Sequence, residues 1–170
     1  MTTTGAAKFK GLLSKVSSKI MIVEEAAQIL EAHMTTSLTK DVEHMILIGD
    51  HEQLRPSLNV HRLSYLYNLD ISMFERLIGN NFENVMLRSQ RRMRPEISEI
   101  VRQIYPGLQD DQSVKGFPGV KGINGRNYLF FHHLNPEDQI SGMMSKTNPK
   151  EAEIIIRFVV YLMQQGYNPD

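Results

Sequence analysis

Two short apolar runs, each followed by acidic residues, alternate with a segment of helical spacing in the N-terminal part of the chain. Residues 20–23 are rich in β-branched side chains and residues 45–48 form a second apolar run, so both predict buried strands. Between them, residues 26–38 combine helix-forming residues with apolar positions at helical spacing. Strand, helix and strand in succession predict a right-handed βαβ unit with parallel strands.

Capping and stop signals predict two further helices in the middle of the chain. Ser72 and Glu75 have the spacing of a capping box at the start of one helix, and Gly79 lies where that helix should stop. Pro95 suits the first turn of the next helix, which we expect to run to Pro106 because proline cannot continue a helix.

The last third of the chain combines an irregular stretch with the strongest helix signal. Residues 106–127 are dominated by glycine, proline and polar residues, which is typical of a long loop, and residues 127–133 predict a strand. Asn148 can cap the final helix, Glu151 completes its capping box, and Gly166 lies at its end. The whole pattern predicts an α/β fold.

Composition is that of an ordinary globular protein, with 41% hydrophobic and 22% charged residues. The 19 basic residues balance the 19 acidic ones, so any nucleic-acid site must be a local concentration of charge. Cysteine is absent, which excludes disulfides and thiolate metal sites and fits a reducing compartment. No stretch is long and apolar enough to span a bilayer, and no targeting segment is visible. We therefore expect a cytoplasmic protein, with a nuclear location as the alternative.

Carboxylates follow both predicted strands at the point where each strand ends. Glu24 and Glu25 come after the first strand, and Asp50 comes after the second. Because ligands of open α/β sheets bind at the carboxyl ends of the strands, these side chains are candidates for one site. Their mutual repulsion would be relieved by a shared cation such as magnesium, which prefers oxygen ligands and often holds substrate phosphates. The alternative is that they are solvated side chains of polar loops.

Three ordered motifs resemble those of the superfamily 1 helicases, specifically the subgroup of the nonsense-mediated-decay RNA helicase and senataxin. VEEAAQ matches the family motif Asp-Glu-Ala-Ala/Ser-Gln except that Glu24 replaces Asp, and GDHEQLRP matches every fixed position of Gly-Asp-x-x-Gln-Leu-x-Pro. QRRMRP matches Gln-Tyr-Arg-Met-His-Pro except at Arg91 and Arg94. SMFERL resembles a helix between these motifs, and TTTGAAKF is similar to the NFX-type zinc-finger helicases.

This resemblance covers essentially the whole chain and implies a fold. The expected architecture is an α/β, RecA-like P-loop NTPase parallel sheet with flanking helices, shared between two motor domains. Residues 1–86 would form the C-terminal half of the first domain, and residues 87–170 would form the start of the second. The expected boundary lies where a short apolar run gives way to the basic segment RSQRRMRP.

The resemblance also implies roles for the acidic motifs. Glu24 would help to hold a magnesium ion, and Glu25 would orient or activate the water that attacks the γ-phosphate of ATP. Asp50 would support the magnesium network and help to bind the cofactor. Gln53 would sense the γ-phosphate and couple it to nucleic-acid binding.

Basic and hydroxyl side chains complete the implied site. Arg92 would contribute positive charge to the phosphoryl transition state, as an arginine finger does. Gln90 would help to position the nucleotide. Thr2, Thr3 and Thr4 would contact the nucleic-acid backbone, since hydroxyl groups suit phosphates.

The implied function is that of a fragment of an ATP-dependent RNA helicase that couples magnesium-ATP hydrolysis to RNA binding and unwinding. By analogy, the parent protein would act in RNA surveillance, silencing or antiviral response, with RNA or another single-stranded nucleic acid, and other proteins, as partners. One alternative, favoured by Glu24 and Arg91, is a helicase-derived RNA or protein interaction module without catalysis. A second is a metal-dependent hydrolase built from four residues: Glu24, Glu25, Asp50 and His51.

The phosphate-binding loop Gly-x-x-x-x-Gly-Lys-Ser/Thr, on which tight triphosphate binding in this family depends, does not occur among the 170 residues. We therefore expect the isolated chain to show little or no ATPase activity, because its metal and water groups lack this partner. Phosphate release by the purified chain measures the activity. Robust turnover that Glu25→Gln abolishes would contradict the expectation.

Overall fold

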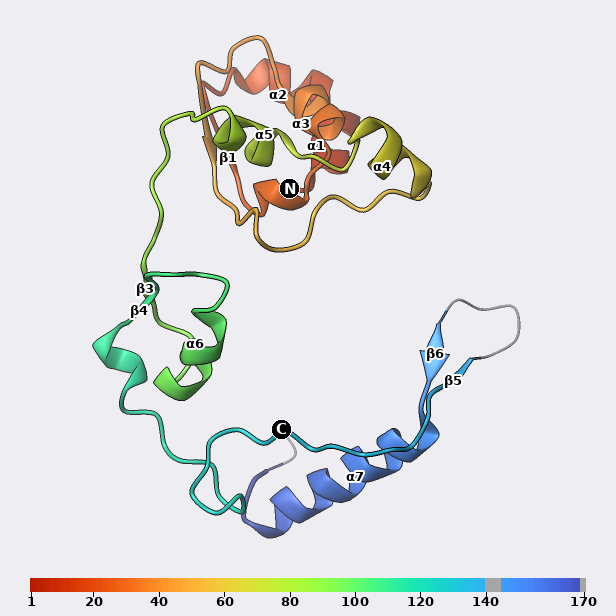
Figure 1. Cartoon of the computed structure of the whole chain (residues 1–170). Coiled ribbons are helices and arrows are strands. Elements are labelled where there is room, and N and C mark those ends of the chain that lie inside the picture. Colours follow the sequence, from red (N-terminus) through yellow and green to blue (C-terminus); the bar gives the residue numbers. More distant parts are fainter. Residues whose placement is uncertain (140–144, 169–170) are drawn as a thin grey trace. The chain divides into compact units, whose positions relative to one another are not determined.

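The computed structural model describes residues 1–139 and 145–168. The chain divides into two compact units, Met1–Met86 and Leu87–Asp170, and each has its own internal packing (Figure 1). The division falls at the residue number where the sequence places a domain boundary. The assignment of the units to the first and second motor domains stays a prediction.

The first unit consists of helices around a pair of parallel strands. Its elements are, in order, α1 (Thr3–Lys8), α2 (Lys10–Val16), β1 (Ile20–Val23), the 3₁₀ turn η1 (Ala26–Gln28), α3 (Glu31–Ser37), β2 (His44–Leu47), α4 (Arg62–Tyr67) and α5 (Met73–Gly79). The strands pair in parallel, with Ile20 opposite His44 and Val23 opposite Leu47. Both strands predicted for this part of the chain, and their parallel direction, are confirmed.

A small hydrophobic core lies where β1 meets the helices. Val23, Ala26, Met34 and Met73 are buried in it. Met34 is fully buried on α3, and Met73 opens α5, so both helices contribute to the same core. Methionine suits this position because its unbranched side chain fills irregular gaps.

The helix predicted over residues 26–38 is interrupted, so this prediction is wrong in part. Glu25 has a left-handed backbone, the 3₁₀ turn η1 follows, and Leu30 is non-helical before α3 begins. Leu30 forms an isolated antiparallel bridge with Ser72. This contact with a distant part of the chain breaks a helix that the local pattern alone would favour.

Helix α5 is capped as predicted and is held to its neighbours by ion pairs. The Ser72 hydroxyl accepts a hydrogen bond from the Glu75 N–H at 3.1 Å. Glu75 does not complete a capping box, because its carboxylate pairs with Arg55 instead. Arg76 donates two hydrogen bonds to Glu31 on α3, at 2.6 and 2.9 Å, and these bonds lower the pKa of Glu31.

The second unit contains short strand pairs and a long C-terminal helix. Its elements are β3 (Ser89–Gln90), α6 (Pro95–Val101), β4 (Gln109–Asp110), the 3₁₀ turn η2 (Gln112–Val114), β5 (Asp138–Gln139), β6 (Lys146–Thr147) and α7 (Pro149–Gln164). β3 and β4 are parallel, whereas β5 and β6 are antiparallel. The Asn148 side chain accepts the Glu151 N–H at 3.0 Å, so the predicted cap of α7 is confirmed.

Two local predictions for this unit are wrong. α6 ends at Val101 and continues only in turns towards Pro106, and the Arg102 side chain donates to the Leu108 carbonyl at 2.9 Å. Residues 127–133 form no strand in the described chain, and Phe130 is 87% exposed. Aromatic and β-branched residues favour a strand only where a neighbouring strand supplies hydrogen bonds and packing.

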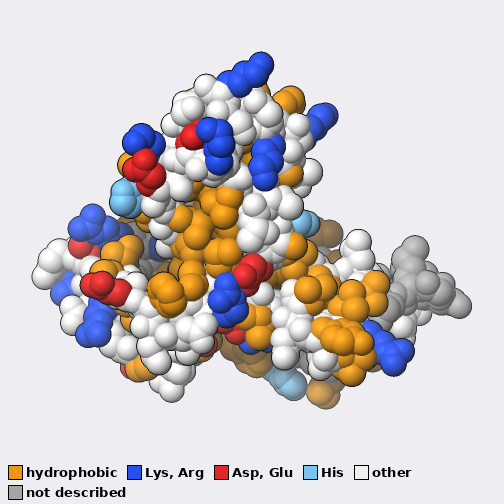
Figure 2. Space-filling model, turned by 90° about the horizontal axis from the view of Figure 1, so that it is seen from above, with side chains coloured by type: hydrophobic (Ala, Val, Ile, Leu, Met, Phe, Trp, Pro, Cys, Tyr) orange, Lys and Arg blue, Asp and Glu red, His pale blue; other side chains and the backbone are white. Residues whose placement is uncertain are grey.

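Large apolar side chains are exposed on both units. Ile22 on β1 and Ile156 on α7 are each 65% exposed. Figure 2 shows apolar side chains over much of the visible face. Among the described residues, no helix has the length and apolar character needed to cross a membrane.

A cluster of polar side chains joins β3, β4 and α6. Asp110 Oδ1 accepts hydrogen bonds from Gln90 Nε2 at 2.7 Å and from the Ser98 hydroxyl at 2.6 Å, and Oδ2 accepts one from Arg102 at 2.6 Å. Ser98 is fully buried, and the Asp110 side chain is 9% exposed. The bonds from Ser98, Gln90 and Arg102 lower the pKa of Asp110. These four side chains are the Asp110 cluster.

Gly49 follows β2 and lies against the turn that follows β1. A Cβ atom at this position would lie 2.9 Å from the Ala27 nitrogen and 3.1 Å from the Ala26 nitrogen. Because the Ala26 N–H is bonded to the Ile48 carbonyl at 2.9 Å, this backbone cannot move aside without losing a hydrogen bond. We expect Gly49→Ala to lower the free energy of unfolding by about 1–3 kcal/mol, measured by urea denaturation.

Gly11→Ala is the matched control for that variant. Gly11 lies in α2, and an added Cβ would meet no atom within 4 Å. Alanine favours helices over glycine, so this variant should be neutral or slightly stabilising. Equal unfolding free energies for the two variants would contradict the close approach at Gly49.

Acid should weaken the second unit through the Asp110 cluster. The pKa of Asp110 lies below its ordinary value of 3.8, so the folded chain binds this proton less readily than the unfolded chain. The resulting stabilisation is complete above that value and is lost as the pH falls through the lower, folded-state pKa. Thermal unfolding from neutral pH to about pH 2 should show a smaller loss for Asp110→Asn than for the wild type. Equal losses would rule out this contribution.

Candidate functional site

The two acidic motifs meet at the carboxyl edge of the β1–β2 pair, within the first unit. The Ile48 N–H donates to the Val23 carbonyl at 2.8 Å, and the Ala26 N–H donates to the Ile48 carbonyl at 2.9 Å. These bonds place the two glutamates of the first motif beside the segment that leads from β2 into Asp50. The edge therefore carries carboxylates from both strands.

Glu25 has an unusual backbone for its residue type. Its φ of 54° and ψ of 37° lie in the left-handed region, which costs a residue with a Cβ atom about 1–2 kcal/mol. Its exposed carboxylate accepts a hydrogen bond from Gln28 Nε2 at 3.1 Å. The last residue of the motif thus holds the second glutamate, and the strained turn presents that glutamate to solvent.

Asp50 and Gln53 are bonded to each other at the start of the loop after β2. Asp50 Oδ2 accepts a hydrogen bond from Gln53 Nε2 at 2.7 Å, and Oδ1 accepts the Glu52 N–H at 3.1 Å. Gln53 is exposed. Asp50 therefore sets the position of the Gln53 amide through a single direct bond.

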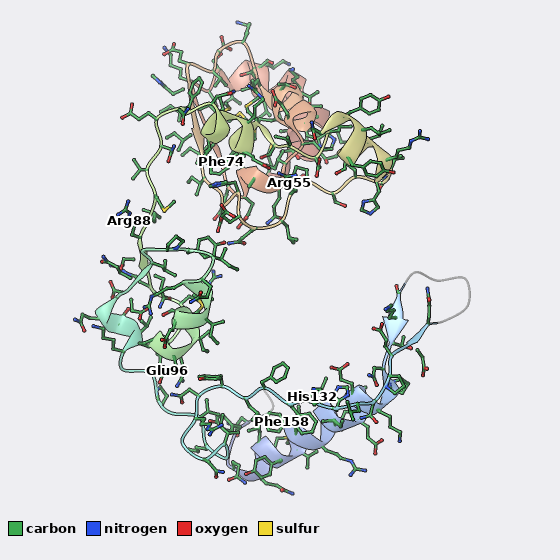
Figure 3. All side chains as sticks on the ribbon, in the orientation of Figure 1. Arg55, Phe74, Arg88, Glu96, His132 and Phe158 are labelled. Carbon is green, nitrogen blue, oxygen red and sulfur yellow. The ribbon has the colours of Figure 1, made fainter. Side chains whose placement is uncertain are left out.

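Contacts with α5 hold the rest of this loop. Arg55 pairs with Glu75 and lies 3.6 Å from an Asp70 oxygen. The His51 ring centroid lies 6.4 Å from that of Phe74. Arg55 and Phe74 both lie in the first unit, on the loop and on α5 (Figure 3). Sequence reasoning missed these contacts, because Arg55 occupies a variable position of its motif and nothing local indicates its partners.

Magnesium, which the motifs imply, would find suitable donors at this edge. Glu24 offers an exposed carboxylate, and the Asp50 carboxylate, which accepts the bonds from Gln53 and Glu52, adds oxygen atoms at the same edge. Such donors fit a hard cation that is also bound by phosphate oxygens. No group of three or more His, Asp or Glu side chains in residues 1–139 and 145–168 could hold a metal. The four residues of the hydrolase alternative therefore do not form a metal site by themselves.

The three arginines of the basic motif, in the second unit, differ in their contacts. Arg91 Nε donates to Asp111 Oδ2 at 3.0 Å, and Arg94 Nη2 donates to the Pro118 carbonyl at 2.8 Å. Arg92 is exposed, and its guanidinium makes no hydrogen bond or ion pair with another described residue. Within the described chain, Arg92 is thus the arginine of this motif whose guanidinium is not already bonded to the protein.

Gln90 directs its amide into the protein. Nε2 donates to the Met93 carbonyl at 2.6 Å and to Asp110 at 2.7 Å, and Oε1 accepts the N–H groups of Arg92 at 3.0 Å and Met93 at 2.8 Å. An amide has two donor hydrogens and two acceptor lone pairs, so these bonds use its full capacity. The geometry favours a role in shaping the turn that carries Arg92 over direct contact with a nucleotide.

The N-terminal threonines lie at the start of α1, in the first unit. The Thr2 hydroxyl accepts the Gly5 N–H at 3.1 Å and so caps the helix, and the Thr3 carbonyl accepts a bond from the Ser37 hydroxyl at 3.4 Å. Thr4 is exposed. An open hollow of about 640 Å³ beside β1 is lined by Thr2, Thr3 and Glu24 together with mostly apolar side chains.

Comparison with known proteins gives the family. Residues 69–170, more than half of the chain, match a family model described as an AAA domain, and residues 1–59 match a second model of the same description. The chain is 45% identical over 170 residues to NFX1-type zinc finger-containing protein 1 of Mus musculus, covering 99% of this chain and 9% of that protein.

Two further relatives carry names that refer to RNA processes. Identity is 39% over 170 residues with Helicase required for RNAi-mediated heterochromatin assembly 1 of Schizosaccharomyces pombe, covering 99% of this chain and 17% of that protein. It is 26% over 164 residues with Regulator of nonsense transcripts 1 of Caenorhabditis elegans, covering 92% and 15%. The chain thus spans a small part of each relative. These matches confirm the family that the motifs indicate: the chain belongs to the superfamily 1 helicases of the nonsense-mediated-decay, senataxin and NFX1-type group, whose AAA domains have the P-loop NTPase fold.

Proposed function

We propose that the chain is the central part of an ATP-dependent RNA helicase that couples magnesium-ATP hydrolysis to RNA binding and unwinding. In this proposal, residues 1–86 belong to the first RecA-like domain and residues 87–170 to the second. The main support is the shared edge of β1 and β2, which carries both acidic motifs. In open α/β sheets this is the edge at which ligands bind.

The glutamates would divide the chemistry at this edge. Glu24 and Asp50 would hold magnesium, which when bound would neutralise charge on the phosphates. Glu25 would orient the attacking water and accept its proton. Its exposed carboxylate, held by Gln28, suits that role. Its left-handed backbone adds support, because such strain tends to persist at functional sites.

Gln53 would connect the nucleotide to the rest of the first unit. Its amide is bonded to Asp50, so a γ-phosphate near Asp50 would compete for that hydrogen bond. The loop beyond Gln53 contacts α5 through Arg55 and Glu75. A change at the γ-phosphate would therefore reach a packed helix through a short chain of contacts.

RNA and phosphate would be met by two further groups. Arg92 would supply charge to the phosphoryl transition state, which its lack of partners among the described residues supports. Thr2, Thr3 and Thr4 would face the RNA backbone, although the Thr2 hydroxyl keeps only its own hydrogen to donate while it caps α1. The names of the relatives support RNA over DNA and a role in RNA surveillance or silencing.

A chimera tests this proposal. The corresponding residues of the mouse relative are replaced by this chain, and ATP hydrolysis is measured with and without RNA. We expect RNA-stimulated turnover, and we expect Glu25→Gln to lower kcat by about 10²–10⁴-fold, because the general base is lost. Glu52→Gln is the control, since this nearby exposed carboxylate pairs with His51 at 3.6 Å and has no proposed role.

The interaction-module alternative makes the opposite prediction for the same chimera. Glu24 in place of aspartate and the Arg91–Asp111 pair in place of a tyrosine favour that alternative. It predicts a chimera that binds RNA but hydrolyses no ATP, while the unaltered mouse protein turns over in the same assay. That outcome would reject the helicase proposal for this chain.

A further inference from the structure

We infer that Asp110, acting through Gln90, is a positioning residue that fixes the backbone from which Arg92 projects. The inference rests on the proposed role of Arg92 in meeting phosphate. It gives a function to side chains outside the recognised motifs, because Asp110, Ser98 and Arg102 belong to none of them.

The first step is the turn itself. Gln90 Oε1 accepts the N–H groups of Arg92 and Met93, and Gln90 Nε2 donates to the Met93 carbonyl. One side chain thus binds three backbone groups of the turn. The Arg92 guanidinium makes no hydrogen bond or ion pair with another described residue, so its position depends mainly on this backbone. An arginine side chain loses roughly 2 kcal/mol of rotamer entropy when it is ordered. Because the Arg92 backbone is already fixed, anion binding would have to order only the side chain.

The second step is the orientation of the Gln90 amide. An ionised carboxylate can only accept hydrogen bonds, and Asp110 Oδ1 lies 2.7 Å from Gln90 Nε2. If the amide were reversed, Oε1 would face both this carboxylate and the Met93 carbonyl, and all three oxygens would repel one another. Asp110 and the Met93 carbonyl therefore both favour the orientation in which Oε1 faces the N–H groups of Arg92 and Met93.

The third step is the anchoring of Asp110. Its register partner across the parallel β3–β4 pair is Gln90, so the two residues face each other on neighbouring strands. Ser98 and Arg102, one turn apart on and just after α6, bind the same carboxylate at 2.6 Å each. Bonds to a charged acceptor are stronger than neutral ones. The packed side of α6 is thereby connected to the turn at Arg92.

A matched pair of residues lies immediately beside this arrangement. Arg91 and Asp111 follow Gln90 and Asp110 in sequence and are joined by a 3.0 Å bond. Their side chains are 76% and 25% exposed, whereas Asp110 is 9% exposed. Removing the Asp111 charge therefore alters a neighbouring carboxylate without touching the Gln90 amide.

Amide hydrogen exchange on the 170-residue chain, followed by NMR, tests the geometric link. We expect Asp110→Asn to speed exchange of the Arg92 and Met93 N–H groups by about tenfold, while amides of α7 keep their protection. Gln90→Met, which keeps the side-chain length but removes its polar atoms, should do the same. Asp111→Asn should leave these two amides unchanged. Unchanged exchange in either Asp110→Asn or Gln90→Met would overturn the inference, as would a uniform loss of protection throughout the second unit.

Titration with tripolyphosphate tests the functional consequence on the same proteins. We expect saturable NMR shifts at Arg92 in the wild type, binding about tenfold weaker in Asp110→Asn, and still weaker but measurable binding in Arg92→Ala. In the Arg92→Ala background, Asp110→Asn should have no further effect, because a residue that acts only through Arg92 has nothing left to position.

The two measurements separate the inference from the proposed function. If Arg92→Ala weakens binding but Asp110→Asn does not, the positioning inference is overturned and the proposed role of Arg92 stands. If exchange at Arg92 and Met93 rises as expected but Arg92→Ala leaves binding unchanged, the proposed role of Arg92 fails and the link through Gln90 is only structural.

Discussion

The backbone hydrogen bonds at the carboxyl ends of β1 and β2 are the constraint on which the candidate site depends. Two four-residue strands form a marginal sheet by themselves. The bond from the Ala26 N–H to the Ile48 carbonyl and the absence of a side chain at Gly49 let the turn after β1 pack on the end of β2. The burial of Met34 and Met73 against Val23 holds this arrangement in place.

The exposed carboxylates at this edge cost the fold little electrostatic free energy. Glu24 and Glu25 are exposed, and two like charges about 4 Å apart in water repel by only about 1 kcal/mol. The strands can therefore hold their carboxylates together without a cation. A bound cation would relieve the remaining repulsion between these carboxylates. Part of the free energy of cation binding would therefore come from the negative charges that the fold already holds close together.

The second unit relies on a different interaction, a nearly buried carboxylate that gathers donors from α6 and β3. Buried ionic groups often contribute more to a defined arrangement than to net stability. Here the arrangement determines which side chains of the basic motif are free. Arg91 and Arg94 are bonded within the protein, and the Gln90 amide uses all its hydrogen-bonding groups. Arg92 has the same side chain as the other two arginines of the motif and differs from them only in its contacts.

The sequence by itself determined the family, both strands of the first unit and the caps of α5 and α7, because each depends on residues close together in the chain. It also placed the acidic motifs at one edge, since parallel neighbouring strands end at the same side. Only the tertiary structure decided the break at Leu30, the role of Gln90 and the availability of Arg92. The first two depend on Ser72 and Asp110, and Arg92 differs from Arg91 because Asp111 bonds Arg91; all three partners are distant in sequence, and a local pattern carries no information about them.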